Sequence, residues 1–222
     1  MNMKMPSRFE SKLEELHNNM LKLCSLVEEV IGISIQAFVK QDKKIATSVV
    51  GAEDEISKLV TIVESEALQI LLLQNPVASD LRAVSTALRI VTDMERIGKQ
   101  ARDICGIVIH LAAQKYQKEQ ITIPLMAERA KQMVNKGIAS YILRDIKLAK
   151  EAIDMDDEMD KMFAKARGNM IVKIQETPEY ADQALYLLMV AKYFEKIGDH
   201  AVNIAEWAIF SKTGEKKNVK LI

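Results

Sequence analysis

The sequence is poor in the residues that break helices, and it is poor in aromatic residues. Its 222 residues include 8 Gly and 4 Pro, and aromatic side chains make up 5%. So few Gly and Pro argue against a loop-rich or disordered chain. The apolar content of 49% is enough for one large core or two small ones. The abundance of Ala, Leu, Ile, Met, Lys and Glu is typical of a helical bundle.

The chain also lacks an excess of charge of either sign. Its 31 acidic and 31 basic side chains cancel, so it has no basic surface of the kind that neutralises nucleic-acid phosphates. We therefore expect no direct nucleic-acid partner. Cys24 and Cys105 are far apart and form no C-x-x-C pattern. This predicts buried free thiols in a reducing cytoplasm, rather than a zinc site or a disulfide.

Long apolar runs are missing as well. The first ten residues, MNMKMPSRFE, have no apolar segment of the secretory-signal kind. The longest weakly charged apolar run, residues 104–113, is far shorter than the ~20 residues that span a bilayer. We expect a cytoplasmic protein with no membrane insertion. The sequence has no nucleophile elbow, glycine-rich phosphate loop or H-E-x-x-H pair either, so no catalytic residue is predicted.

What the sequence does contain is an internal duplication. The segment DKKIATSVVGAEDEISKL, from Asp42, aligns with DIKLAKEAIDMDDEMDKM, from Asp145, at an offset of 103 residues. Further along, ERIG at Glu95 aligns with EKIG at Glu195 at an offset of 100. Because the matches keep their order, we predict two repeats, residues 1–116 and 117–222.

Each repeat divides into three helices. Apolar residues recur at intervals of three and four rather than two, which favours helices over strands. Ser7 with Glu10 forms a capping box, and Asn75-Pro76 and Thr177-Pro178 each place a cap residue before a Pro. The predicted helices cover residues 7–40, 43–73, 77–115, 124–143, 146–175 and 178–211. The expected fold class is therefore all-α, two tandem three-helix bundles related by duplication.

The third helix of each repeat carries a row of polar residues one turn apart. The rows are Glu195, Asp199 and Asn203 in the second repeat and Glu95, Lys99 and Asp103 in the first. Each row lies roughly opposite an apolar stripe, so we expect it off the core. Upstream the same rows are apolar, which predicts that the third and sixth helices are central. Gly98 and Gly198, in mid-helix, predict close helix crossings, because Gly there costs about 1 kcal/mol relative to Ala.

These rows have two interpretations. Carboxylates one turn apart repel each other unless a cation lies between them, and oxygen ligands suit a hard metal ion. Glu195 and Asp199 therefore predict a metal site, with a solvated polar face as the alternative. His200 is adjacent but rotated away from the row, which is more typical of a histidine at the edge of a helix than of a ligand.

Three segments resemble those of a known family. They are NPVASDLR at residues 75–82, ERIG at 95–98 and EKIGDHAVNIAEW at 195–207. The chain resembles the PhoU family of phosphate-uptake regulators over nearly its whole length. The resemblance implies a cytoplasmic, all-α homodimer that represses the phosphate-starvation response. It implies two partners, the ATPase of the phosphate ABC transporter and the sensor histidine kinase of the phosphate regulon.

The resemblance also bears on the metal site. Some members of the family bind metal clusters through the repeated acidic motif, which implies iron, zinc, manganese or magnesium here. Glu195 and Asp199 keep the motif E-x-x-x-D, whereas Lys99 stands where the family pattern has Asp. Lys99 can pair with Glu95 and with Asp103 at helical spacing. We therefore expect asymmetric metal binding, weaker in the first repeat.

Three functional classes follow. The first is a non-enzymatic regulator that acts by protein–protein contact, which we expect. The second is a metalloenzyme, in which acidic rows of facing helices hold a metal that activates water or oxygen. The sequence does not have the two Glu-x-x-His motifs that di-iron bundles use, which counts against it. The third is a helical scaffold without metal.

Overall fold

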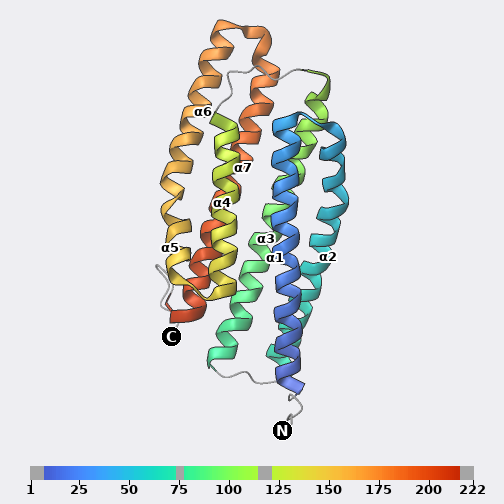
Figure 1. Cartoon of the computed structure of the whole chain (residues 1–222), viewed down its shortest axis with the longest axis vertical. Helices are drawn as coiled ribbons and strands as arrows, with labels where there is room; N and C mark the ends of the chain where they lie inside the picture. The colour runs from blue at the N-terminus through green and yellow to red at the C-terminus, as the bar shows by residue number, and fades with distance from the viewer. Residues whose placement is uncertain (1–7, 74–77, 115–121, 216–222) are drawn as a thin grey trace.

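The chain is described by a computed structural model that covers residues 8–73, 78–114 and 122–215. Its helices run side by side along one axis (Figure 1). They are α1 (Arg8–Lys40), α2 (Lys43–Leu73), α3 (Ala78–His110), α4 (Thr122–Leu143), α5 (Ile146–Asp154), α6 (Asp156–Glu176) and α7 (Ala181–Thr213), with 3-10 turns η1 (Leu111–Ala113) and η2 (Pro178–Tyr180). The described ranges contain no strand, and the all-α prediction is confirmed.

The two repeats lie against each other. In the first, α1, α2 and α3 pack together; in the second, α4 and α7 pack with the α5–α6 arm. Contacts of α3 with α7 and of α1 with α4 join them, and Figure 1 shows α2 and the α5–α6 arm on opposite sides. The prediction that the third helix of each repeat is central is confirmed, since α7 contacts α3, α4, α5 and α6. The predicted boundary at 116 and 117 lies outside the described residues.

Some predicted helix ends differ from the structure. The fifth helix is broken at Met155, whose N–H donates to the carbonyl of Ala152 at 3.3 Å in a single tight turn. The third helix tightens into η1 after His110, and η2 precedes α7. Thr177 makes no side-chain capping bond. The predicted caps at Ser7 and at Asn75-Pro76 involve residues outside the described ranges.

The duplication is visible in the turns that follow α1 and α4. Gln41 and Arg144 are left-handed, with φ of 54° and 52°. The N–H groups of Asp42 and Asp145 each donate a hydrogen bond to the carbonyl five residues earlier, at 3.0 Å, which is the Schellman arrangement. The carboxylates of these two Asp residues then accept backbone N–H bonds that open the next helix. Both repeats thus reverse direction in the same way.

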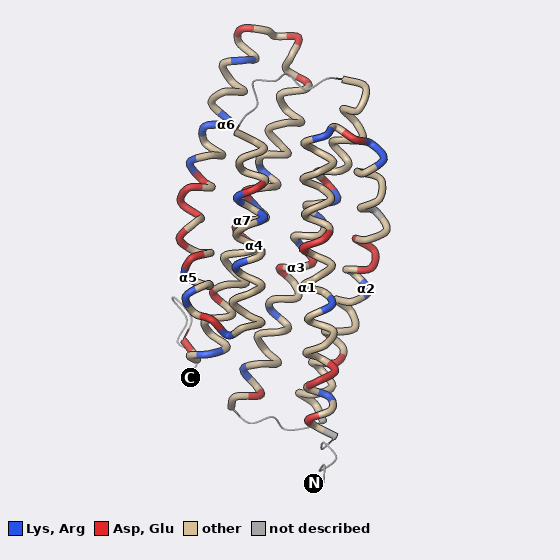
Figure 2. Tube along the Cα trace, viewed as in Figure 1, with Lys and Arg blue, Asp and Glu red and all other residues tan. Residues whose placement is uncertain are grey.

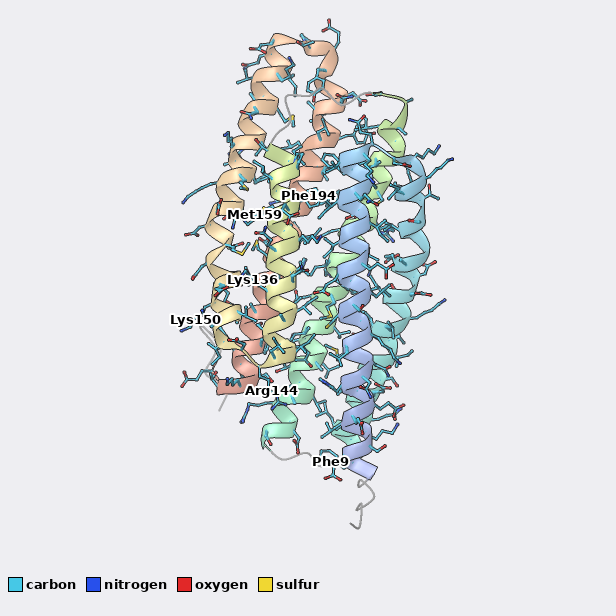
Figure 3. All side chains as sticks on the ribbon, in the orientation of Figure 1. Phe9, Lys136, Arg144, Lys150, Met159 and Phe194 are labelled. Carbon is cyan, nitrogen blue, oxygen red and sulfur yellow. The ribbon has the colours of Figure 1, made fainter. Side chains whose placement is uncertain are left out.

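The apolar stripes of α3 and α7 form the core. Their members are Ile90, Met94, Ile97, Ala101, Ile104 and Val108 on α3 and Val190, Phe194, Ile197, Ala201 and Ile204 on α7, all of them buried. One continuous apolar cluster spans both repeats. Phe194, labelled in Figure 3, packs edge-to-face against Phe38 of α1 with ring centroids 6.2 Å apart. The last helix therefore completes the core of the first repeat.

Glycines mark the closest helix crossings. A Cβ on Gly98 would lie 2.8 Å from Cδ1 of Ile56 on α2, and one on Gly198 would lie 3.2 Å from Cε of Met133 on α4. These are the close crossings that the sequence predicts. At Gly137 of α4 a Cβ would lie 2.9 Å from the backbone oxygen of Ala201. Of these three glycines, Gly137 alone faces a backbone atom, which cannot change rotamer to make room for a Cβ.

Across the described ranges, none of the helices has an apolar stretch long enough to cross a membrane.

Candidate functional site

The polar row of α7 is more buried than the sequence indicates. Glu195 is only 7% exposed, so the expectation that the row lies off the core is wrong for this residue. The reason is that helices cover α7 on several sides. The Glu195 carboxylate lies 2.7 Å from Nζ of Lys192 and 3.6 Å from Nζ of Lys196. Lys196 also pairs with Asp199, so one ammonium group joins the two predicted ligands.

A carboxylate of α6 joins this row. Burial raises the pKa of Asp156, and the negative charges of Asp199 and Asp160 raise it further. Oδ1 of Asp156 is buried and accepts no hydrogen bond within the described part of the chain. Sequence reasoning missed Asp156. The signal was present, because Asp156 and Glu53 are both acidic at matching positions of the aligned segments.

The second repeat therefore has more carboxyl groups than ammonium groups at this point. Asp156, Glu195 and Asp199 lie beside Lys192 and Lys196. Hydrogen bonding to Asp199 raises the pKa of Lys196, and the charge of Glu195 adds to this effect. Figure 2 shows the acidic run at the start of α6 in red. The site is a partly neutralised acidic cluster between α6 and α7.

The row of α3 is neutralised in another way. Lys99 Nζ lies 2.6 Å from Oε1 of Glu95, as the sequence predicts. The expected pairing of Lys99 with Asp103 is not what the structure shows, because Asp103 accepts from Arg102 at 3.3 Å. The same guanidinium reaches the buried Glu53 of α2 at 3.1 Å. Arg102 therefore ties α2 to α3.

Asn203 belongs to a different contact. Its Nδ2 donates to Oδ1 of Asp93 on α3 at 3.3 Å, and Nδ1 of His200 lies 2.8 Å from the same oxygen. Asp93 thus connects the central helices of the two repeats. The structure brings Glu195 and Asp199 together but engages Asn203 at the junction between the repeats.

A metal ion would have to compete with lysine here. Within the described residues, no three His, Cys, Asp or Glu side chains form a group that could hold a metal ion. The oxygen atoms of Asp156, Glu195 and Asp199 are nevertheless the ligand type that hard cations prefer. Lys196 pairs with Glu195 and Asp199 where a cation would bind. In the structure, this place is held by the Lys196 ammonium, so the chemistry of the oxygen atoms suits a hard cation but their arrangement is that of an ion-pair cluster.

Comparisons with known proteins match the duplication. A family model described as the PhoU domain matches residues 20–108 and again residues 123–208. A protein of Clostridium acetobutylicum, named phosphate-specific transport system accessory protein PhoU homolog, is 32% identical over 209 residues, 94% of this chain and 95% of that protein. A protein of Aquifex aeolicus with the same name is 34% identical over 204 residues, 92% of each chain.

Solved structures agree with the fold. The crystal structure of PhoU from Pseudomonas aeruginosa superposes with a TM-score of 0.91 at 26% identity, over 94% of this chain and 100% of that one. The phosphate transport system regulatory protein PhoU from Streptococcus pneumoniae gives a TM-score of 0.86 at 23% identity, over 96% of this chain and 100% of that one. The second similarity supports the fold alone.

Proposed function

The chain belongs to the PhoU family, and on that premise we propose that it is an accessory protein that regulates phosphate transport. The observation that carries the proposal is the match of both repeats to the PhoU domain. Relatives that align over more than nine-tenths of the chain are named accessory proteins of phosphate transport. The chain is accordingly a regulatory protein and not an enzyme, and the metalloenzyme alternative has no support among these relatives.

The proposed mechanism is repression of the phosphate-starvation response by protein contact in the cytoplasm. The partners are the transporter ATPase and the sensor histidine kinase. Large apolar side chains on two outer surfaces support contact with partners, because exposed apolar groups favour association. They are Ile62, Leu68 and Leu72 on α2 and Ile171, Val172, Leu185 and Met189 on α6 and α7, each at least 45% exposed. Charged side chains around them would set register more than affinity.

The test is deletion and complementation in the native host. At high phosphate we expect deletion to raise alkaline phosphatase or transporter expression, and the intact gene to restore repression. Pull-down from the same cells should recover the transporter ATPase, the kinase or both. If deletion leaves expression repressed and neither partner is recovered, the proposed mechanism is wrong. Light scattering on the purified chain tests the proposed homodimer, and a monomer at all concentrations would contradict it.

The metal proposal concerns the asymmetry between the two rows. Cation binding should be stronger at Glu195 and Asp199, because Arg102 and Lys99 already hold permanent positive charges in the first row. The measurement is Mn²⁺ titration followed by elemental analysis. The double variant Glu195→Ala with Asp199→Ala should lose most of the bound metal, whereas the matched Glu95→Ala with Asp103→Ala should not. Equal loss in both variants, or no metal in the unmodified chain, would rule out the asymmetric site.

A further inference from the structure

A cavity lies between the two repeats near one end of the bundle. Its volume is about 200 Å³, and α1, α3, the end of α4 and the end of α7 all contribute to its walls. Apolar side chains such as Leu13, Leu16 and Val84 form one wall. The polar residues that line it are His17, Asp80, Tyr141, Arg144 and Ser211. An opening with an apolar wall and a few convergent polar groups is the general form of a small-ligand site.

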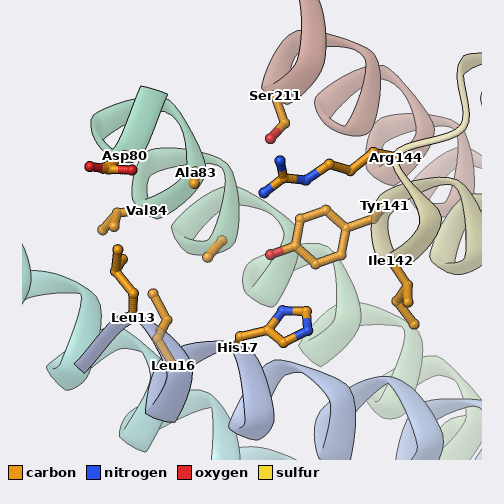
Figure 4. Close-up of a pocket in the computed structure, with 11 residues that line it drawn as sticks. Leu13, Leu16, His17, Asp80, Ala83, Val84, Tyr141, Ile142, Arg144 and Ser211 are labelled. Atoms are coloured by element: carbon orange, nitrogen blue, oxygen red, sulfur yellow. The ribbon is translucent and has the colours of Figure 1, made fainter. Parts of the chain in front are cut away.

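The polar groups converge and are free to bind. Figure 4 shows the guanidinium of Arg144 between the hydroxyl groups of Ser211 and Tyr141, with the ring of His17 on the facing helix. Among the described residues, no hydrogen bond or ion pair engages the side chain of any of these four. Burial raises the pKa of Tyr141, so its hydroxyl keeps a proton that it can donate. The pocket therefore offers several unused donors around one cation.

The backbone holds Arg144 in place at a cost. Its left-handed conformation, with φ of 52°, is unfavourable for an arginine because of its Cβ, whereas glycine adopts it freely. Nζ of Lys212 donates to its carbonyl at 2.9 Å, which ties the turn to the end of α7. Gln41 occupies the equivalent turn of the first repeat, with φ of 54°, and does not line this pocket. The turn itself therefore does not require arginine.

We propose that this pocket binds a small oxyanion of the phosphate type. Arg144 presents two parallel N–H donors, a geometry that matches two oxygen atoms of a phosphate group. Tyr141 and Ser211 supply further donors to the same group. Asp80 also lines the pocket. Its carboxylate would repel a fully deprotonated oxyanion, but it would accept a hydrogen bond from an oxyanion that still carries an O–H group. Phosphate and its esters therefore suit the pocket, whereas sulfate at neutral pH does not.

A ligand bound at this position would contact both repeats. The donors come from α1 on one side and from α4 and α7 on the other, so an occupied pocket holds the two repeats in one relative arrangement. The choice of phosphate as the probe rests on the proposed function. The arrangement of donors in the pocket is observed independently of that proposal. Direct binding and host complementation are separate experiments, so failure of one proposal is distinguishable from failure of the other.

The experiment is calorimetric titration of the full chain at constant ionic strength. The ligands are inorganic phosphate, glycerol 3-phosphate and sulfate. We expect saturable binding of inorganic phosphate or of glycerol 3-phosphate, and much weaker binding of sulfate. Whichever of the two phosphate ligands binds more tightly shows whether the natural ligand is free phosphate or a phosphate monoester. Arg144→Gly should lower the affinity roughly tenfold or more, because it removes a bidentate charged donor. It should also keep or raise the melting temperature, because glycine relieves the left-handed turn.

The matched control is Gln41→Gly, which relieves the equivalent turn and leaves the pocket unchanged. It should bind phosphate as the unmodified chain does. Arg144→Lys should be intermediate, because it keeps the charge but loses the planar fork. The proposal is overturned by absence of saturable binding with both phosphate ligands, by unchanged affinity in Arg144→Gly, or by sulfate binding as tightly as phosphate.

Discussion

The two repeats share their turns and core positions, but they neutralise their acidic rows differently. In the first repeat, Arg102 on α3 reaches Glu53 on α2 and so joins two helices. In the second repeat, Val202 stands at the position of Arg102, and the cations are Lys192 and Lys196 on α7 itself. The first row is therefore part of the scaffold, because its cation links α2 to α3.

The cations of the second row differ in their freedom to move. Lys192 and Lys196 are long, flexible and partly exposed, and they pair with carboxylates three residues away on their own helix. Such pairs contribute little to stability and can rearrange. The row of α7 is thus neutralised mainly by lysines of its own helix, whereas the row of α3 depends on an arginine that connects two helices.

The largest expected effect distinguishes two equivalent residues of the shared core, one on α7 and one on α3. Phe194→Ala should destabilise the chain by about 3–5 kcal/mol, because a buried aromatic side chain that also contacts Phe38 is lost. Met94→Ala, at the equivalent position of α3, should cost less, near about 2–3 kcal/mol, because methionine fits its surroundings less rigidly. Urea denaturation followed by circular dichroism measures both. A larger loss in Met94→Ala would show that α3, and not α7, contributes more to the shared core.

The next effect concerns the crossing of α4 over α7. Gly137→Ala should destabilise by about 1–3 kcal/mol, because the new Cβ would meet the backbone oxygen of Ala201 at 2.9 Å. Ser34, at the equivalent position of α1, already carries a Cβ and is buried. The hydroxyl of Ser34 donates to the carbonyl of Ile31 at 2.8 Å, so Ser34→Ala should cost about 1 kcal/mol or less, the value of one hydrogen bond. Thermal melting of both variants checks this, and equal losses would contradict the difference between the crossings.

A smaller effect tests whether the row of α3 is scaffold. Arg102→Val, which copies the second repeat, should cost about 1 kcal/mol, because the buried carboxylate of Glu53 loses its cation while the half-exposed arginine had contributed only modestly. Lys192→Ala, in the second repeat, should cost less than Arg102→Val, because Lys196 remains 3.6 Å from Glu195 when Lys192 and its contact with the ring of Phe163 are lost. The measurement is again urea denaturation. If the two losses are equal, the distinction between the rows is wrong.

The smallest effect uses the two thiols, both of which lie in the first repeat. Burial raises the pKa of Cys24 and of Cys105 to about 12, so neither forms thiolate at neutral pH in the folded chain. Alkylation should therefore be negligible in the native state and complete in urea. Rapid labelling at neutral pH without urea would show that the first repeat opens locally. The second repeat has no cysteine, so this experiment does not report on it.

Periodicity predicted the features that depend on local sequence. The stripe through Ile97 and Ile197, the six helical segments and the duplication follow from spacing along one chain, and the structure has them. The break at Met155 was not predictable, because the residues around it continue a helical pattern.

The site depends on contacts between distant segments. Arg102 meets a partner 49 residues away, and His200 meets Asp93 across 107 residues. The burial of Glu195 depends on how the helices around α7 pack against it, which one helix viewed alone does not reveal. The spacing of Glu195 and Asp199 along one helix was readable from the sequence, but the burial of Glu195 was not.

The packing of α7 against α3 also has a consequence for synthesis. A chain made from its N-terminus completes α1, α2 and α3 roughly a hundred residues before α7, and such units generally fold in order of emergence. The nascent first repeat then exposes the apolar surface around Phe38 that Phe194 later covers. Until the last helix leaves the ribosome, that surface is available to chaperones or to another nascent copy. Premature termination before α7 would therefore leave this apolar surface uncovered and yield an aggregation-prone chain.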